Sequence, residues 1–190
     1  MMEKTNSLKT QNEIASAWLP ITIKSLHEAM DKKGIRSQRR ILYNSIAGNI
    51  VNDDIVGSME YACKVSGSKL IVVLGHSRCG AIDGAVNHVE MGNLTGLLEK
   101  IKPAVEKADA NMDHIPHDIL NEKVAYANVL NSMDEILERS SIIRTLYKEG
   151  KIGLVGGMYS VENGKVHFTK KMFSDAEPQQ NMATNKNIAA

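Results

Sequence analysis

Residues Lys69–Val86 have the sequence KLIVVLGHSRCGAIDGAV, in which an apolar run ends in a polar turn. The run, Leu70–Leu74, is rich in β-branched residues and far shorter than the ~20 residues of a membrane span, so it predicts a buried strand of a parallel sheet. His76 and Cys79 follow at once, separated by two residues. Open α/β sheets hold their chemistry at the carboxyl ends of their strands, and this turn places both side chains there.

His76 and Cys79 offer an imidazole and a thiolate, the two ligand types that zinc prefers. The gap of two residues allows both side chains to point into one site. The spacing alone also fits a buried histidine and a small buried cysteine without metal, or a redox-active thiol at Cys79. Gly75 and Gly80 flank the pair, and we expect them to let the backbone of the turn come close to the ligands.

The rest of the chain alternates predicted helices with predicted strands. Periodic apolar residues predict helices at 12–33, 55–66, 79–89, 94–108, 118–138 and 142–148. A kink or break is expected at Pro103, inside the fourth of these helices. Strand patterns cover 39–46, 70–74, 151–159 and 165–169, and a turn at 162–164 joins the last two. This alternation predicts an α/β fold with a largely parallel sheet flanked by helices and a C-terminal hairpin.

Composition narrows the class of protein. The chain has 190 residues, enough for one domain with a proper core, and its formal net charge of +1 gives no footprint for nucleic acid or an anionic membrane surface. The first residues, MMEKTNSLKTQNE, are polar and lack the apolar core of a signal peptide. The cysteines, Cys63 and Cys79, are too few for a disulfide framework. We therefore expect a reduced, cytoplasmic protein without nucleic-acid or membrane partners.

Five segments of the chain resemble β-class carbonic anhydrases, in the order in which that family has them. The turn GHSRCGA, which follows the apolar run, is similar to the family's zinc-binding signature. The other four resemble the family's Ala-Gly-Asn turn, the helix before the central strand, a late helix, and the closing strand with its hairpin: Ala47–Val51, Ser58–Ala62, Val124–Val129 and Gly150–Val166. The resemblance covers residues 44–170. It leaves 1–43 as an unmatched N-terminal segment and 171–190 as a flexible tail.

The resemblance implies a zinc enzyme that interconverts carbon dioxide and bicarbonate in a homodimer or higher homo-oligomer, with His76 and Cys79 as zinc ligands. It also implies a third ligand, a cysteine on an earlier strand that opens a Cys-x-Asp-Ser-Arg motif. The Asp–Arg pair of that motif serves the zinc-bound water. This chain has no cysteine before Cys63 and no Asp-Ser-Arg. We therefore identify no catalytic residue and expect weak zinc binding and impaired hydration.

Because the motif is missing, two hypotheses about function remain open, and the origin of the N-terminal segment also needs an explanation. Either the chain is a carbonic anhydrase of impaired activity, or it is an inactive homologue that serves as an oligomerisation or bicarbonate-binding module. Residues 1–43 are either diverged or the product of a truncated or frame-shifted reading, and the abrupt start of the match favours the latter. Without the family's first strand, a neighbouring strand would expose its edge and apolar face unless residues 12–46 substitute for it.

Other metal-ligating residue types are present, and structural explanations account for them. Cys63 is a candidate replacement ligand, but it lies on the apolar side of a predicted helix, where a core residue is expected. His114 and His117 form a His-x-x-His around Pro116. The proline rules out helical spacing between the two histidines, so the pattern is typical of an exposed loop rather than a metal site.

Overall fold

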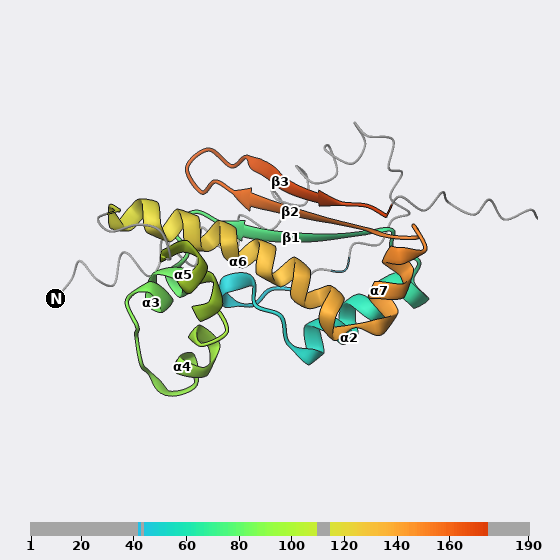
Figure 1. The fold of residues 1–190 in the computed structure, drawn as a ribbon, viewed down its shortest axis with the longest axis horizontal. Coiled ribbons are helices and arrows are strands. Elements are labelled where there is room, and N and C mark those ends of the chain that lie inside the picture. Colours follow the sequence, from blue (N-terminus) through green and yellow to red (C-terminus); the bar gives the residue numbers. More distant parts are fainter. Residues whose placement is uncertain (1–41, 43, 110–114, 175–190) are drawn as a thin grey trace, which may run out of the picture.

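The computed structural model describes residues 42, 44–109 and 115–174 (Figure 1). Its elements are η1 (Ala47–Asn49), α2 (Asp53–Glu60), η2 (Tyr61–Val65), β1 (Leu70–His76), α3 (Gly80–Val86), α4 (Gly92–Leu98), α5 (Lys102–Asp109), α6 (His117–Arg139), α7 (Ser141–Lys148), β2 (Gly153–Tyr159) and β3 (Val166–Met172). Three predicted segments lie wholly or partly outside the described residues: the helix at 12–33, part of the strand at 39–46, and residues 175–190 of the expected tail. No described helix is long and apolar enough to cross a membrane.

The described strands form one sheet in the order β1-β2-β3. β1 pairs with β2 in parallel, from Leu70 opposite Gly153 to His76 opposite Tyr159. β3 pairs with β2 antiparallel and completes the C-terminal hairpin. The α/β fold is therefore confirmed, with a described sheet that is mixed: one parallel pair and one antiparallel pair.

Helix α6 packs closely on one face of the sheet, which we call the α6 face. A Cβ atom added to Gly75 would lie 2.8 Å from Val129 Cγ2, and one added to Gly156 would lie 2.6 Å from Met133 Sδ. Two clusters of buried side chains make the core. One joins α6 to the sheet and includes Ile71, Val73, Val129, Met133 and Leu154. The other joins α6 to α3, α4 and α5 and includes Cys79, Ile82, Leu98, Ile101 and Val124.

Most element boundaries follow from local chemistry. The predicted helix at 118–138 is confirmed as α6. The predicted helix at 94–108 is two helices, α4 and α5, because Pro103 has no N–H to donate and is accommodated in the first turn of α5. The predicted helix at 55–66 begins earlier, at Asp53, because the Asn52 side chain accepts a hydrogen bond from the backbone N–H of Ile55 at 2.9 Å.

Two strand predictions differ from the structure. Leu42 and residues 44–46 are not in a strand, so the prediction for 39–46 is wrong over those positions. The predicted strand at 165–169 is longer as β3, which ends at Met172 and takes in the first two residues of the expected tail. Lys170 and Lys171 carry no apolar pattern that would have extended the strand in the sequence. Their backbone pairing with β2 includes them in the ladder.

Candidate metal site

The turn after β1 brings His76 and Cys79 together. β1 ends at His76, and Cys79 is the N-cap residue of α3 with extended dihedral angles (φ −73°, ψ 118°). Between them Arg78 adopts a left-handed conformation, φ 56°, which reverses the chain within the turn. His76 is half-buried and Cys79 is buried. The expected position at the carboxyl end of the central strand is therefore where the structure places both side chains.

The C-terminal hairpin fastens this turn. The backbone N–H of Ser77 donates to the carbonyl oxygen of Tyr159 at 3.0 Å, and the Ser77 hydroxyl oxygen accepts from the N–H of Val161 at 3.0 Å. Arg78 forms an ion pair with Glu162, but these side chains are 73% and 63% exposed, so solvent screens the pair and it adds little. The two hydrogen bonds of Ser77 therefore hold the turn in place.

Both side chains of the pair take part in hydrogen bonds that affect their pKa. His76 Nδ1 donates to the carbonyl oxygen of Ser77 at 2.9 Å, and in this tautomer Nε2 is the ring nitrogen that can accept a proton or bind a metal. The hydrogen bond with Cys79 raises the pKa of His76, and burial opposes this shift. Burial raises the pKa of Cys79, but hydrogen bonds from His76 and from the N–H groups of Ile82 and Ala81 together lower it. The net pKa of Cys79 is lowered, so the thiolate forms more readily there than at an isolated cysteine.

The described part of the chain supplies no third ligand. Among the residues that the structure describes, no three His, Cys, Asp or Glu side chains form a group able to hold a metal ion. Cys63 is buried in the core cluster that contains Ile71, whereas Cys79 belongs to the other cluster, and burial raises the pKa of the Cys63 thiol. The His76–Cys79 pair thus fits two positions of a tetrahedral zinc ion, where at least three protein ligands are needed.

Of the two histidines in the His-x-x-His pattern, the structure describes only His117. His114 lies outside the described residues. His117 is the first residue of α6, and its Nε2 lies 3.2 Å from Asn87 Oδ1 and 3.7 Å from Asp83 Oδ1. His117 is exposed, as expected for a surface residue.

The glycines beside the pair have different surroundings. Gly75 lies within β1, and a Cβ atom there would meet both Val129 Cγ2 and Met158 Sδ at 2.8 Å. Gly80 begins α3, and a Cβ atom there would meet nothing within 4 Å. We predict that both glycines let the backbone approach the ligands, and this stays a prediction. The structure adds that Gly75 allows α6 to lie close against the strand that carries His76.

A polar network beside the site was missed in the sequence. Asn128 on α6 donates through Nδ2 to the carbonyl oxygen of Gly48 at 2.6 Å, and the Ser132 hydroxyl donates to the carbonyl oxygen of Asn49 at 2.9 Å. Asn49 Nδ2 in turn donates to Ser132 Oγ at 3.1 Å. Asn128 and Ser132 are buried polar residues on the apolar stripe of a helix, and their four-residue spacing was the signal that could have revealed them.

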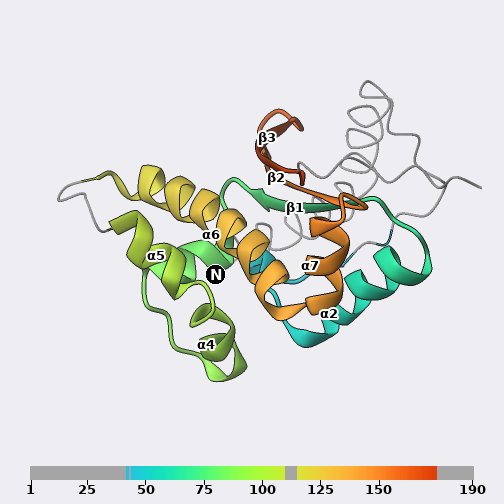
Figure 2. The ribbon, with the colours of Figure 1, turned by 45° about the vertical axis from the view of Figure 1, so that its right-hand side comes forward.

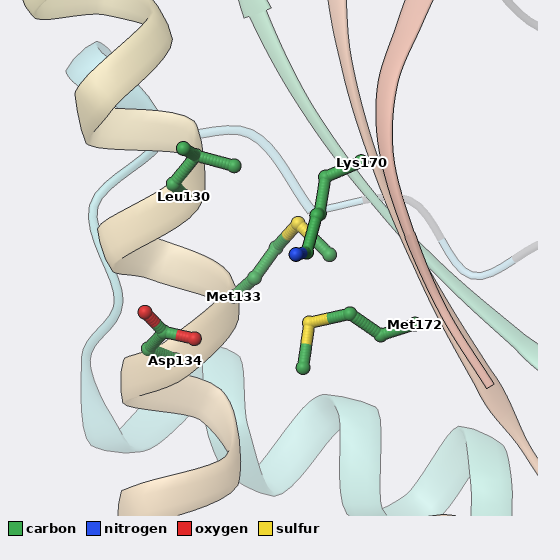
Figure 3. A pocket seen from close by; sticks show the side chains of 5 residues that line it. All are labelled: Leu130, Met133, Asp134, Lys170 and Met172. Carbon is green, nitrogen blue, oxygen red and sulfur yellow. The ribbon is translucent and has the colours of Figure 1, made fainter. Parts of the chain in front are cut away.

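One cavity lies on the α6 face of the sheet, apart from the turn that holds the pair. Its volume is about 120 Å³, and it is lined by Leu130, Met133, Asp134, Lys170 and Met172 (Figure 3). Small-molecule sites usually enclose roughly 300–1,000 Å³. This cavity is therefore too small for an ordinary ligand pocket.

Comparison with known proteins gives the family. The carbonic anhydrase family model matches residues 38–166, more than half of the chain. Carbonic anhydrase 2 of Mycobacterium tuberculosis is 30% identical over an alignment of 128 residues, and the match covers 63% of this chain and 58% of that protein. The chain belongs to the carbonic anhydrase family, and structural neighbours at 25% identity place it among the β-class members.

Two solved structures illustrate the shared fold. A Coccomyxa β-carbonic anhydrase in complex with acetazolamide superposes with a TM-score of 0.65 at 20% identity, covering 73% of this chain and 65% of that one. A structure from a study of two tetrameric β-carbonic anhydrases of Sordaria macrospora gives a TM-score of 0.55 at 25% identity, with 64% of each chain covered. The chain spans less than two thirds of the length of the curated relative from Mycobacterium tuberculosis.

Proposed function

We propose that this chain is a β-carbonic-anhydrase-like zinc protein for the reversible hydration of carbon dioxide, in which His76 and Cys79 hold the metal. The observation that carries the proposal is the hydrogen-bonded His76–Cys79 pair at the carboxyl end of β1, within a chain whose family is carbonic anhydrase. Family membership implies the reaction, and the donor types suit zinc. Carbon dioxide and bicarbonate are then the small-molecule partners.

The residues of the turn would have distinct tasks. The hydrogen bond from His76 Nδ1 to the Ser77 carbonyl fixes the tautomer that presents Nε2 to a metal. Hydrogen bonds to Cys79 lower the pKa of its thiol and so ease formation of the thiolate, the form that ligates. Zinc, when bound in such sites, lowers the pKa of its water to about 7 and so supplies hydroxide at neutral pH.

We propose further that zinc binding and hydration are impaired in this chain. The printed sequence has no cysteine before Cys63 and no Asp-Ser-Arg, and the described residues offer no third ligand beside the pair. Two ligands hold zinc weakly, because protons compete for both donors and the ion keeps too few protein contacts. The same observations favour the second candidate function, an inactive homologue that acts as an oligomerisation or bicarbonate-binding module.

The proposed setting is a homo-oligomer in a reducing compartment. The solved relatives from Sordaria macrospora are described as tetrameric, which supports a homodimer or higher assembly here. Cys63 and Cys79 are both free and buried, which suits a cytoplasmic protein.

Zinc content and carbon dioxide hydration, measured on the same purified full chain, separate the two functions. The enzyme hypothesis predicts zinc in the protein and hydration above the buffer rate, with both lost in His76→Ala. The matched control is His88→Ala, because His88 is exposed and away from the turn. A folded chain that neither takes up zinc nor hydrates carbon dioxide would leave the inactive homologue.

A further inference from the structure

The sheet face opposite α6 carries a continuous set of apolar side chains at its centre, and we call it the open face. Side chains alternate between faces along a strand, so the face opposite Gly75 and Gly156 carries Leu70, Val72 and Leu74 of β1. β2 and β3 continue it: a Cβ atom on Gly157 would meet Leu74 Cδ2 at 3.0 Å and Phe168 Cδ1 at 3.3 Å. Val155 on β2, the central strand, lies opposite Val72 in the parallel ladder and so shares its face. The open face is defined by Leu70, Val72, Leu74, Val155 and Phe168. By the same alternation, His76 ends its β1 row, and the exposed Lys171, which pairs with Val155, lies on its β3 edge.

The described helices leave the open face without a cover. In both ribbon views they lie on the side of the sheet where α6 packs (Figures 1 and 2). Among the described residues, the five side chains of the open face belong to neither core cluster and pack against neither. The three from β1 and Phe168 are half-buried, and Val155 is 7% exposed. Parallel strands are normally covered on both faces, so this face needs a partner.

The chain itself contains a segment of suitable length and pattern. The predicted helix at 12–33 has apolar residues spaced along it: Ile14, Trp18, Ile21, Leu26 and Met30. Pro20 limits the longer helical part to 21–33, which is about 20 Å long as an α-helix. The seven residues of β1 extend over about 23 Å. One such helix therefore matches the length of the strands that it would cover.

A short connection joins this segment to the described chain, which begins at Leu42. The eight residues 34–41 span up to roughly 26–29 Å when extended. A short tether also holds the segment at an effective concentration in the millimolar range, which favours its own chain over a second copy.

We propose that the apolar side of the segment 12–33 docks on the open face of the same chain and covers the sheet opposite α6. The segment thereby closes the second layer of the α/β domain. This docking requires no metal, and its readouts are crosslinks and tryptophan emission rather than zinc content or hydration, so its failure is distinguishable from failure of the proposed function.

Photo-crosslinking of the full chain identifies the occupant of the open face. A benzophenone amino acid replaces Phe168 on the open face or, as the matched control on the same strand, Lys170, which faces α6 near Met133. The proposal predicts crosslinks from position 168 to peptides of 12–33, and crosslinks from position 170 to α6. Irradiation of mixed light and isotope-labelled chains tests the source. Crosslinks between light and labelled chains would assign the face to a second copy, and position-168 crosslinks that avoid 12–33 would overturn the docking.

Trp18 provides a second readout, because it is the only tryptophan of the chain. Docking predicts that its emission is blue-shifted and poorly quenched by acrylamide in the native protein. Phe168→Thr should shift the emission to the red and increase quenching, whereas Lys170→Thr should change neither. Far-UV circular dichroism checks that both variants are folded. A native Trp18 as accessible as in urea, or an equal response of the two variants, would overturn the proposal.

Discussion

Replacing Gly75 by alanine should destabilise the fold, although the same change at Gly80 should not. A Cβ atom at Gly75 would lie 2.8 Å from both Val129 Cγ2 and Met158 Sδ. The Met158 side chain can move, but Val129 is 0% exposed and is held by the core. Such overpacking typically costs about 1–3 kcal/mol. For a domain of this size that corresponds to a melting temperature lower by roughly 2–12 °C.

Gly80→Ala is the matched control, because Gly80 flanks the same turn but has open space around the position of a Cβ atom. A Cβ atom there meets nothing within 4 Å, and the residue is helical. Alanine should therefore be neutral or stabilise by about 0.4–1 kcal/mol, through reduced freedom of the unfolded chain. Urea unfolding followed by circular dichroism, with a chelator present to exclude metal, measures both changes. A Gly75→Ala variant within about 0.5 kcal/mol of the parent protein would refute the close approach of α6 to β1.

Three further predictions concern the polar groups of the site and core. Asn128→Ala leaves the carbonyl of Gly48 without its donor and should cost about 1–3 kcal/mol in urea unfolding; an unchanged midpoint would contradict the 2.6 Å hydrogen bond. Ser140→Ala removes the N-cap of α7 and should lower stability by about 1–2 kcal/mol, unlike the exposed Ser141→Ala. Zinc should bind more weakly as pH falls through the raised pKa of His76, because the imidazole must be neutral to ligate; a pH-independent affinity would exclude His76 as a ligand.

Features set by local sequence could be predicted, since their cause lies within a few residues. The apolar run at 70–74 is in β1, and the periodic stretch at 118–138 is in α6. The turn that follows β1 and the C-terminal hairpin also lie where the sequence predicts them. The position of His76 and Cys79 followed from the strand and turn alone. Each of these rests on side-chain alternation or helical spacing, which the sequence displays directly.

Features set by distant contacts could not be predicted. The close packing at Gly75 depends on Val129, which is far away in the sequence, and no periodic pattern records such a contact. The hydrogen bonds between Ser77 and the hairpin join distant residues; the one from Val161 spans 84 positions of the chain. The strand expected at 39–46 has apolar and β-branched residues, yet positions 44–46 lead directly into η1, where Gly48 adopts φ 68°. The turn of the backbone at η1, rather than the strand propensity of residues 44–46, therefore decides whether these residues can pair with another strand.

Competition for zinc between the full chain and a chromophoric chelator tests the metal-site proposal most directly, with His76→Ala and Cys63→Ser measured beside it. A site made by His76 and Cys79 without a third described ligand predicts that the parent protein yields its zinc readily to the chelator. Binding should disappear in His76→Ala and remain unchanged in Cys63→Ser, since Cys63 lies in the other core cluster. Zinc affinity that survives His76→Ala, or that is lost in Cys63→Ser, would contradict the proposed site.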